Sequence, residues 1–193
     1  MTSLQELLRR AAQDLDALGL DWALVGGLAV SAHTQPRFTA DVDLAVAVAG
    51  DEQAEAMVQG LRERGWVVHA LVEQEAAKRL ATVRLVGDDT EGPIVDLLLA
   101  SSGIEPEIVQ TAEILEVFPD RRVRVARPGH LIAVKLLARS AARPQDDVDL
   151  RALLAVADGA DLKLAADAVK LIERRGFARG RDLASALEQL IAP

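Results

Sequence analysis

Apolar residues recur along this chain with two different periods, and the periods predict where helices and strands lie. Near the N-terminus six apolar residues lie three or four positions apart, with Ser3 as a cap and Gly19 as a stop: Leu4, Leu7, Leu8, Ala11, Leu15 and Leu18. This spacing places them on one face of a helix over residues 3–18. Helical spacing also predicts helices over residues 52–64 and 105–112.

Shorter apolar runs predict the strands. Residues 22–25 are apolar throughout and stop at the glycine pair 26–27, after which the sequence LAVSAH suits a helix, so the pattern indicates strand, tight turn and helix. Over residues 42–48 every second residue is a large apolar one, which predicts a strand with one buried face and puts Asp41 and Asp43 together on the other face. Further runs predict strands over residues 66–72, 80–86 and 94–99 and a hairpin of residues 114–118 and 123–125.

After Pro128-Gly129 the strands give way to helices. The apolar spacing predicts four of them, over residues 130–140, 147–156, 161–174 and 181–190. We therefore predict an α+β protein in two parts. A mixed β-sheet flanked by helices would fill residues 1–127, and a helical bundle would fill residues 128–193.

Composition narrows the classes of chemistry open to the chain. It has 193 residues, the length of one compact domain or of one domain with a small appendage, and half of them are apolar. It has no cysteine, which excludes disulfides, cysteine-based zinc sites and thiol nucleophiles. Five residues are aromatic, so few could stack on nucleobases: Trp22, Trp66, Phe38, Phe118 and Phe177.

The charge is unevenly distributed along the sequence. The net charge is −8, which argues against a protein that coats nucleic acid over its whole surface. Residues 121–145 and 174–181, however, carry only basic charges, and such tracts can hold a phosphate-rich partner on one face. No signal peptide and no apolar stretch long enough to span a bilayer occur in the sequence, so we expect a cytoplasmic protein without a membrane partner.

The residues with the strongest chemical indication lie between positions 24 and 96. A strand that stops at Gly26-Gly27 leaves backbone N–H groups open to a phosphate, and the next helix N-terminus favours the same charge. Asp41 and Asp43 would project from one face of a strand toward a divalent cation. Asp96 lies in the apolar run IVDLLL, where its charge needs a partner. If the two strands are neighbours, the three carboxylates form a cluster that metal would stabilise.

The order of these residues resembles that of the nucleotidyltransferase superfamily with the polymerase-beta type of catalytic fold. Its pattern is an apolar residue with Gly-Gly or Gly-Ser, then Asp-x-Asp, and later one acidic residue in an apolar strand; residues 25–27, 41–44 and 95–97 match it. The segment RFTADVDL, residues 37–44, looks most like the minimal nucleotidyltransferases of bacterial abortive-infection and toxin-antitoxin systems, of AbiEii and MenT type.

A second match lies downstream. LIAVKLLA, residues 131–138, followed by Arg143 and residues 146–149, is similar to the lysine-containing helix and the Arg-x-x-Asp-x-x-Asp pattern that close the active site in that group. The resemblance covers roughly residues 24–154, and the residues beyond add nothing to it.

The resemblance implies an enzyme that moves a nucleoside monophosphate from an NTP to an acceptor hydroxyl, with pyrophosphate leaving. Asp41, Asp43 and Asp96 would be catalytic and would hold two Mg²⁺ ions, with Asp96 near the incoming hydroxyl. The nucleotide would be held by Gly26, Gly27, Arg37, Lys135 and Asp146, and Lys135 would share in catalysis. The favoured acceptor is the 3′ end of tRNA, as the target of a toxin with a cognate antitoxin protein.

Other functions remain open at this point. Transfer to a small molecule, such as an aminoglycoside, or to a protein hydroxyl suits the low net basicity. A catalytically silent binding scaffold would need a lost metal ligand, and all three carboxylates are present. Fold alone does not decide among these.

Each element also has an ordinary explanation. Gly26-Gly27 could be a plain turn, Asp41 and Asp43 a solvent face, and Lys135 part of a solvated helical stripe with Arg139 and Arg143. Asp146 or Asp147 could cap a helix. We expect three histidines to be structural or superficial, namely His33, His69 and His130.

Thr39 precedes Asp41 by two residues, near where a triphosphate would enter. It is therefore a candidate for regulatory phosphorylation, the alternative being a plain strand residue.

Overall fold

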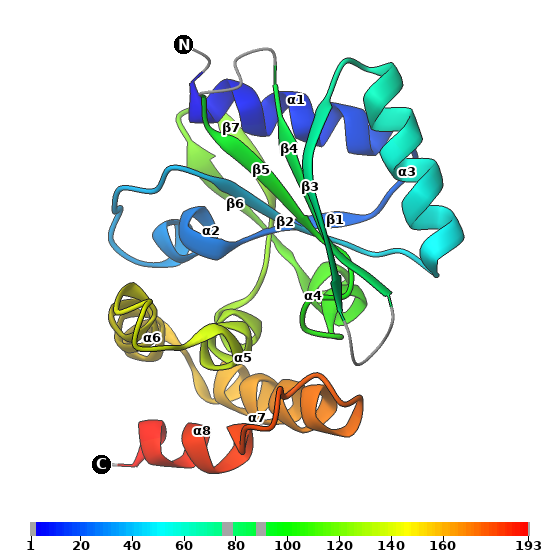
Figure 1. The fold of residues 1–193 in the computed structure, drawn as a ribbon. Coiled ribbons are helices and arrows are strands. Elements are labelled where there is room, and N and C mark those ends of the chain that lie inside the picture. The colour runs from blue at the N-terminus through cyan, green and yellow to red at the C-terminus, as the bar shows by residue number, and fades with distance from the viewer. Residues whose placement is uncertain (1–2, 75–78, 88–91, 193) are drawn as a thin grey trace.

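The computed structural model describes residues 3–74, 79–87 and 92–192. They form a seven-stranded mixed sheet with helices around it, which confirms the predicted α+β class (Figure 1). The strands are β1 (Trp22–Val25), β2 (Val42–Val46), β3 (Val67–Gln74), β4 (Arg79–Val86), β5 (Ile94–Leu98), β6 (Glu113–Phe118) and β7 (Arg121–Val125). The helices are α1 (Leu4–Ala17), α2 (Gly26–His33), α3 (Asp51–Glu63), α4 (Glu105–Thr111), α5 (Pro128–Ala138), α6 (Gln145–Val156), α7 (Gly159–Arg174) and α8 (Leu183–Ile191).

The strand order is β3-β4-β5-β2-β1-β7-β6, so segments far apart in the sequence lie side by side. β2 runs antiparallel to β1 and parallel to β5, while β5 runs antiparallel to β4. The register aligns one residue from each of these four strands in a row across the sheet: Val25, Asp43, Asp96 and Arg84. Directly paired residues of neighbouring strands point to the same face, so this row brings three charged side chains together.

The core is aliphatic, as the composition predicts. Its largest fully buried side chains are leucines and isoleucines, among them Leu24, Leu44 and Leu97 in the central strands. Both tryptophans are also buried, and each indole N–H donates to a carboxylate of α1 at 2.8 Å, Trp22 to Asp16 and Trp66 to Asp14. A buried indole needs such a partner, and these two bonds attach α1 to the sheet.

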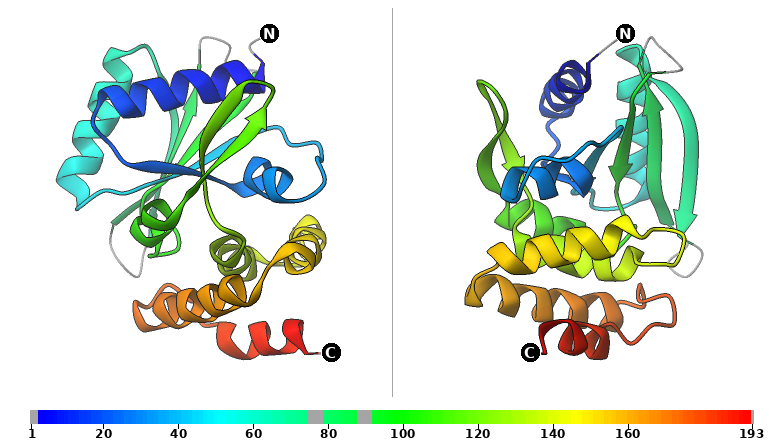
Figure 2. Two further views of the ribbon diagram at one scale, coloured as in Figure 1. Left: turned by 180° about the vertical axis from the view of Figure 1, so that it is seen from behind. Right: turned by 90° about the vertical axis from the view of Figure 1, so that its left-hand side faces the viewer.

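The helices α5 to α8 stack at the end of the molecule opposite α1 (Figures 1 and 2). Gly129 lets the start of α5 approach α7 closely, because a Cβ there would overlap the carbonyl oxygen of Asp161. Arg181, in the loop before α8, donates to the carbonyl oxygens of Leu137 at 2.9 Å and Arg139 at 2.6 Å. These carbonyls end α5 without intrahelical partners, so Arg181 caps that helix. The division at residue 127 falls between β7 and α5 and stays a prediction.

Several boundaries differ from those predicted. α2 begins at Gly26 itself, so the glycine pair forms the helix N-terminus and not a separate turn. α5 ends at Ala138, whereas the spacing predicted a helix to residue 140. Arg139 is the C-cap, Arg143 lies beyond the helix and Lys135 is buried, so the alternative of a solvated stripe of these three residues does not hold. In the part of the chain that the structure describes, no helix is both long enough and apolar enough to cross a membrane.

Candidate active site

A cleft of about 760 Å³ lies between the row of charged residues on the sheet and the helices α5 and α6. All the residues that the sequence singled out for a role in catalysis, nucleotide binding or regulation line it: Gly26, Gly27, Arg37, Thr39, Asp41, Asp43, Asp96, Lys135 and Asp146. Arg143 lines it too. Elements more than a hundred residues apart in sequence thus supply one site.

The N-terminus of α2 forms one wall of the cleft. Gly26 has φ +64° and lies against Asp43, and a Cβ at this position would overlap the Asp43 carboxylate. A Cβ on Gly27 would lie 2.8 Å from Thr39 Oγ1 and 3.0 Å from Arg37 Nη2. Both glycines are therefore required for the start of α2 to lie this close to Asp43, Thr39 and Arg37. The first N–H groups of the helix have no side-chain cap and face a space that suits an anion.

Three carboxylates occupy the sheet side of the cleft. Asp43 pairs with Asp96 across β2 and β5, and Asp41 precedes Asp43 by two residues. Burial raises the pKa of Asp43 to about 6, and the neighbouring charges of Asp96 and Asp41 add to the shift. The ionised form of Asp43 is therefore destabilised at neutral pH, and a cation bound beside it would stabilise that form.

Arg84 is a site residue that sequence analysis missed. Its guanidinium donates to both oxygens of Asp96, from Nε at 2.8 Å and from Nη2 at 2.7 Å. This pair supplies the compensating charge that the sequence argument assigned to metal. A charged residue within the apolar run of 80–86 is a signal that could have found Arg84, but only the register of β4 and β5 shows which carboxylate it meets.

The fit of this site to a divalent cation is partial. Among the described residues no group of three or more His, Cys, Asp and Glu side chains is arranged to hold a metal ion. Asp41 and Asp43 face the cleft with oxygen ligands of the kind that Mg²⁺ prefers, whereas both oxygens of Asp96 are bonded to Arg84. Asp41 and Asp43 could hold such an ion directly, and Asp96 could do so once Arg84 moves.

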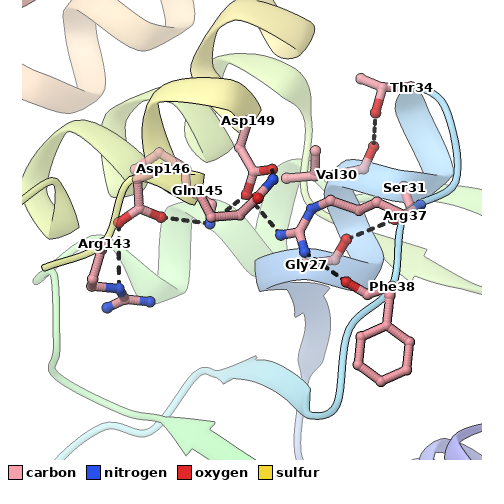
Figure 3. Close-up of polar contacts among 11 residues, drawn as sticks. Gly27, Val30, Ser31, Thr34, Arg37, Phe38, Arg143, Gln145, Asp146 and Asp149 are labelled. Carbon is pink, nitrogen blue, oxygen red and sulfur yellow. Dashed lines mark hydrogen bonds and ion pairs between the residues drawn. The ribbon is translucent and has the colours of Figure 1, made fainter.

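The opposite wall is an ion network built around α6 (Figure 3). The Lys135 ammonium contacts Asp146 at 2.8 Å and Asp149 at 2.7 Å, and Arg37 donates to Asp149 at 2.8 Å. Burial alone would raise the pKa of Asp149, but hydrogen bonds from Lys135, Arg37 and Gln145 outweigh it and hold the pKa below its ordinary value. The network holds Lys135 and Arg37 beside the N-terminus of α2, in a position suited to a polyphosphate.

Asp149 was not predicted as a site residue, although it closes the Arg-x-x-Asp-x-x-Asp pattern. It lies three residues after Asp146 on the same helix and is buried. Asp146 is not the cap of α6, because Pro144 occupies that position and Asp146 lies in the first turn. Both carboxylates orient the cations and do not face the cleft as free anions.

The family of the chain follows from comparison with known proteins. A family model described as "Nucleotidyl transferase AbiEii toxin, Type IV TA system" matches residues 7–192. The chain belongs to this family. The match extends well beyond residue 154, so the helices α7 and α8 are part of the AbiEii unit although their sequence carries no recognisable motif.

Solved structures share the AbiEii fold seen here. An antigenic nucleotidyltransferase-like protein from Paracoccidioides brasiliensis is 20% identical over 96% of this chain and 92% of that one, with a TM-score of 0.55. The antibiotic-resistance factor ANT(2'')-Ia is 19% identical over 98% of this chain and 97% of that one, with a TM-score of 0.54. No curated protein matches the chain. Membership of the AbiEii family makes the chain a nucleotidyltransferase, and the structural neighbours share its fold.

The two basic tracts of this AbiEii protein are partly engaged in contacts within the protein. Most of their side chains make internal contacts: Arg124 with Asp21, Arg127 with Asp161, Arg139 with Asp147, and Arg175 with Glu107. That these tracts hold a nucleic-acid strand stays a prediction. Among the residues that the structure describes, five cations line the cleft, namely Arg37, Arg84, Lys135, Arg143 and Arg179.

The histidines lie apart from the cleft residues. His33 Nε2 is 2.8 Å from the carbonyl oxygen of Ala126, and His69 is exposed on β3. His130 is buried beside Thr111, and burial lowers its pKa to about 4. None of the three lines the cleft among the described residues, as expected for structural or superficial histidines.

Proposed function

We propose that the chain is a Mg²⁺-dependent enzyme that transfers a nucleoside monophosphate from an NTP to a hydroxyl at the 3′ end of tRNA. The single observation that carries the metal-dependent step is the placement of Asp43 directly opposite Asp96 in the β2–β5 register, with Asp41 two residues away, on one wall of the cleft. Burial there raises the pKa of Asp43 to about 6. Arg84 compensates the charge of Asp96, so a further cation is needed beside Asp41 and Asp43. The opposite wall supplies fixed cations and a helix N-terminus for phosphates.

The nucleotide would lie with its triphosphate along α2. The N–H groups of Gly26 and Gly27, Arg37 and Lys135 would bind its oxygens, and the Asp149 contacts would keep both cations in place. These groups orient the α-phosphate for attack in line with the departing pyrophosphate.

Asp41 and Asp43 would hold Mg²⁺, and two ions together would neutralise the triphosphate and activate the acceptor hydroxyl. The Arg84 guanidinium would first leave Asp96 for a phosphate oxygen of the acceptor or the nucleotide. The freed Asp96 carboxylate would accept the proton of the acceptor hydroxyl. One P–O bond to the acceptor oxygen would form while the P–O bond to pyrophosphate breaks.

The charge around the cleft favours a polynucleotide over an aminoglycoside acceptor. Arg84 and Arg179 lie on the side of the cleft that Thr82, Leu98 and Ser101 line. The lining carboxylates are Asp41, Asp43, Asp96 and Asp146, and all are assigned to the metal site or to cations in the described residues. A polycationic sugar would find no acidic subsite, whereas a phosphodiester would find arginines. We infer a cytoplasmic toxin with a cognate antitoxin partner, in line with the type IV family description.

A labelling experiment identifies the acceptor. The protein is incubated with each of four α-labelled NTPs, Mg²⁺, total tRNA and cell protein, beside Asp41→Ala/Asp43→Ala. We expect label on tRNA from one preferred NTP, and only with intact carboxylates. Label on protein or on a small molecule would reject the tRNA acceptor, and equal labelling by the double variant would reject the catalytic assignment.

Regulation through Thr39 is part of the same proposal. Its side chain lies against Gly27, where the nucleotide phosphates would bind. Phosphorylation would add nearly two negative charges there and exclude the triphosphate. We expect Thr39→Glu to lose most transfer activity while Thr39→Ala keeps it. Equal activity of the two variants would contradict this role.

A further inference from the structure

Phe38 is exposed in a way that no other aromatic residue of the chain is. All five aromatic residues lie in the part of the chain that the structure describes. Trp22, Trp66 and Phe177 are buried and Phe118 is partly buried, whereas Phe38 is 90% exposed. An isolated exposed ring is not unusual by itself. Its position beside the cleft and the way its backbone is held make it informative.

The backbone of Phe38 is held by a hydrogen bond from a guanidinium that is itself anchored. Arg37 Nη1 donates to the Phe38 carbonyl oxygen at 3.0 Å, while Nη2 of the same guanidinium binds Asp149 on α6. The next residue, Thr39, lies close to Gly27, since a Cβ on Gly27 would be 2.8 Å from Thr39 Oγ1. Figure 3 shows the ring directed away from the Arg37–Asp149 contact. The segment therefore presents the ring from an anchored position.

The ring stands outside the cleft, at its rim. Arg37 and Thr39 line the cleft, and Phe38 between them does not. A nucleotide or a small acceptor seated within the cleft would therefore not meet the ring. A polymer that enters the cleft with its terminal hydroxyl would pass over the rim and would meet it.

We propose that Phe38 is a stacking platform for an unpaired base of an RNA acceptor, next to the nucleotide whose hydroxyl enters the cleft. The inference rests on the proposed function, because it takes the acceptor to be a polynucleotide. Two observations favour a nucleobase. Residues 34–40 contain no acidic side chain in a chain of net charge −8, and the ring offers an open aromatic face, 90% exposed, beside the cleft. Unpaired bases stack on aromatic faces with little dependence on sequence.

The test uses a labelled RNA hairpin with four unpaired nucleotides at its 3′ end, and binding is measured by fluorescence anisotropy. We expect Phe38→Ala to weaken binding about fivefold or more, and Phe38→Trp to bind close to wild type. The matched control is Ile114→Ala, because Ile114 is also a large exposed apolar residue, 60% exposed, but lies on β6 outside the cleft. It should bind as wild type does.

Abasic probes locate the contact. The hairpin is made with one unpaired base missing, at each position in turn. For one position the wild-type affinity should fall to that of Phe38→Ala, and the variant should lose nothing more. That coupling is expected of a direct ring–base contact, and a general loss of structure would not produce it.

Three results would overturn the inference. Phe38→Ala could bind every probe as wild type does, it could lose NTP affinity in place of RNA affinity, or it could lose only the affinity for a protein partner. Transfer of label to RNA, lost in Asp41→Ala/Asp43→Ala, is measured in parallel. If wild type labels RNA and Phe38→Ala binds RNA normally, the stacking role of Phe38 is rejected and the RNA acceptor stands. If wild type never labels RNA, the proposed acceptor is rejected and the stacking role with it.

Discussion

Gly26 is a cleft residue at which the structure leaves no room for a side chain. Its φ of +64° disfavours any other residue, and an alanine Cβ would displace the Asp43 carboxylate. We expect Gly26→Ala to lower the free energy of unfolding by about 1–3 kcal/mol and to abolish nucleotidyl transfer. Gly159→Ala is the control, because no atom lies within 4 Å of its Cβ position. Equal activity in the two variants would show that the α2 N-terminus is not part of the site.

Asp43 is a residue whose function costs stability. The pKa of Asp43 in the folded protein, about 6, lies above the ordinary value of 3.8, so ionisation of this carboxyl favours the unfolded state. The folded protein has its full stability below pH 3.8 and loses part of it as the pH rises through 6. Asp43→Asn removes that penalty. We expect the variant to be more stable than wild type by about 1–3 kcal/mol at neutral pH and by less at acid pH.

Urea unfolding of both proteins at about pH 4.5 and pH 7.5 measures this difference. The contribution of His130 to stability also changes between these values, because burial lowers its pKa from the ordinary 6.5 to about 4, but this change is the same in both proteins and cancels. If wild type were more stable than Asp43→Asn at about pH 7.5 without Mg²⁺, the ionised Asp43 would not destabilise the folded protein and the prediction would be wrong.

Most of the site residues could be predicted from the sequence, because their chemistry is explicit in residue type and order. Small or charged residues at strand ends or within apolar runs are unusual unless they have a function, and four of the candidates are of this kind: Gly26, Asp41, Asp43 and Asp96. The partners that hold them could not be predicted. Asp96 meets Arg84, and Arg37 meets Asp149 across 112 residues, and neither pairing follows from local pattern.

The elements were predictable for the same reason, and their arrangement was not. Apolar periodicity is a local property and predicts α1, β2 and α7 within a few residues. Strand order and register depend on contacts across the whole chain. β2 lies between β1 and β5, and this arrangement turns separate acidic motifs into one row.

The pairing of β4 with β5 makes its own prediction. Arg84 covers both oxygens of Asp96, so Arg84→Ala should open Asp96 to Mg²⁺ and raise the affinity of the protein for that ion. We expect a larger Mg²⁺-induced increase in Tm than in wild type, from a lower starting Tm because Asp96 loses its partner. The control is Arg79→Ala, on the same strand, whose arginine pairs with Asp51. An Mg²⁺ response in Arg84→Ala equal to or smaller than that of wild type would exclude this competition.

On the scale of the whole molecule, the cleft depends on the helices of residues 128–191 as much as on the sheet. α5 contributes Lys135, α6 contributes Asp146 and Asp149, and the loop before α8 contributes Arg179. That loop is attached by Arg181 to the end of α5 and by Phe177, which is buried against Gly103. The sequence indicated a basic tract there but not that its arginines mostly serve internal contacts. The AbiEii match over residues 7–192 agrees with a site built by the whole chain.

The central claim is that the carboxylates of this cleft carry out metal-dependent nucleotidyl transfer. The most direct test measures pyrophosphate released from each NTP in the presence of total tRNA, for wild type, Asp43→Asn and Asp167→Asn. Asp167 is an aspartate on α7 paired with Lys163 outside the cleft, and Asp43→Asn is expected to be folded and stable, so a loss of activity cannot be due to unfolding. We predict release by wild type and Asp167→Asn that requires Mg²⁺, and none by Asp43→Asn. Pyrophosphate release by Asp43→Asn at the wild-type rate would contradict the account.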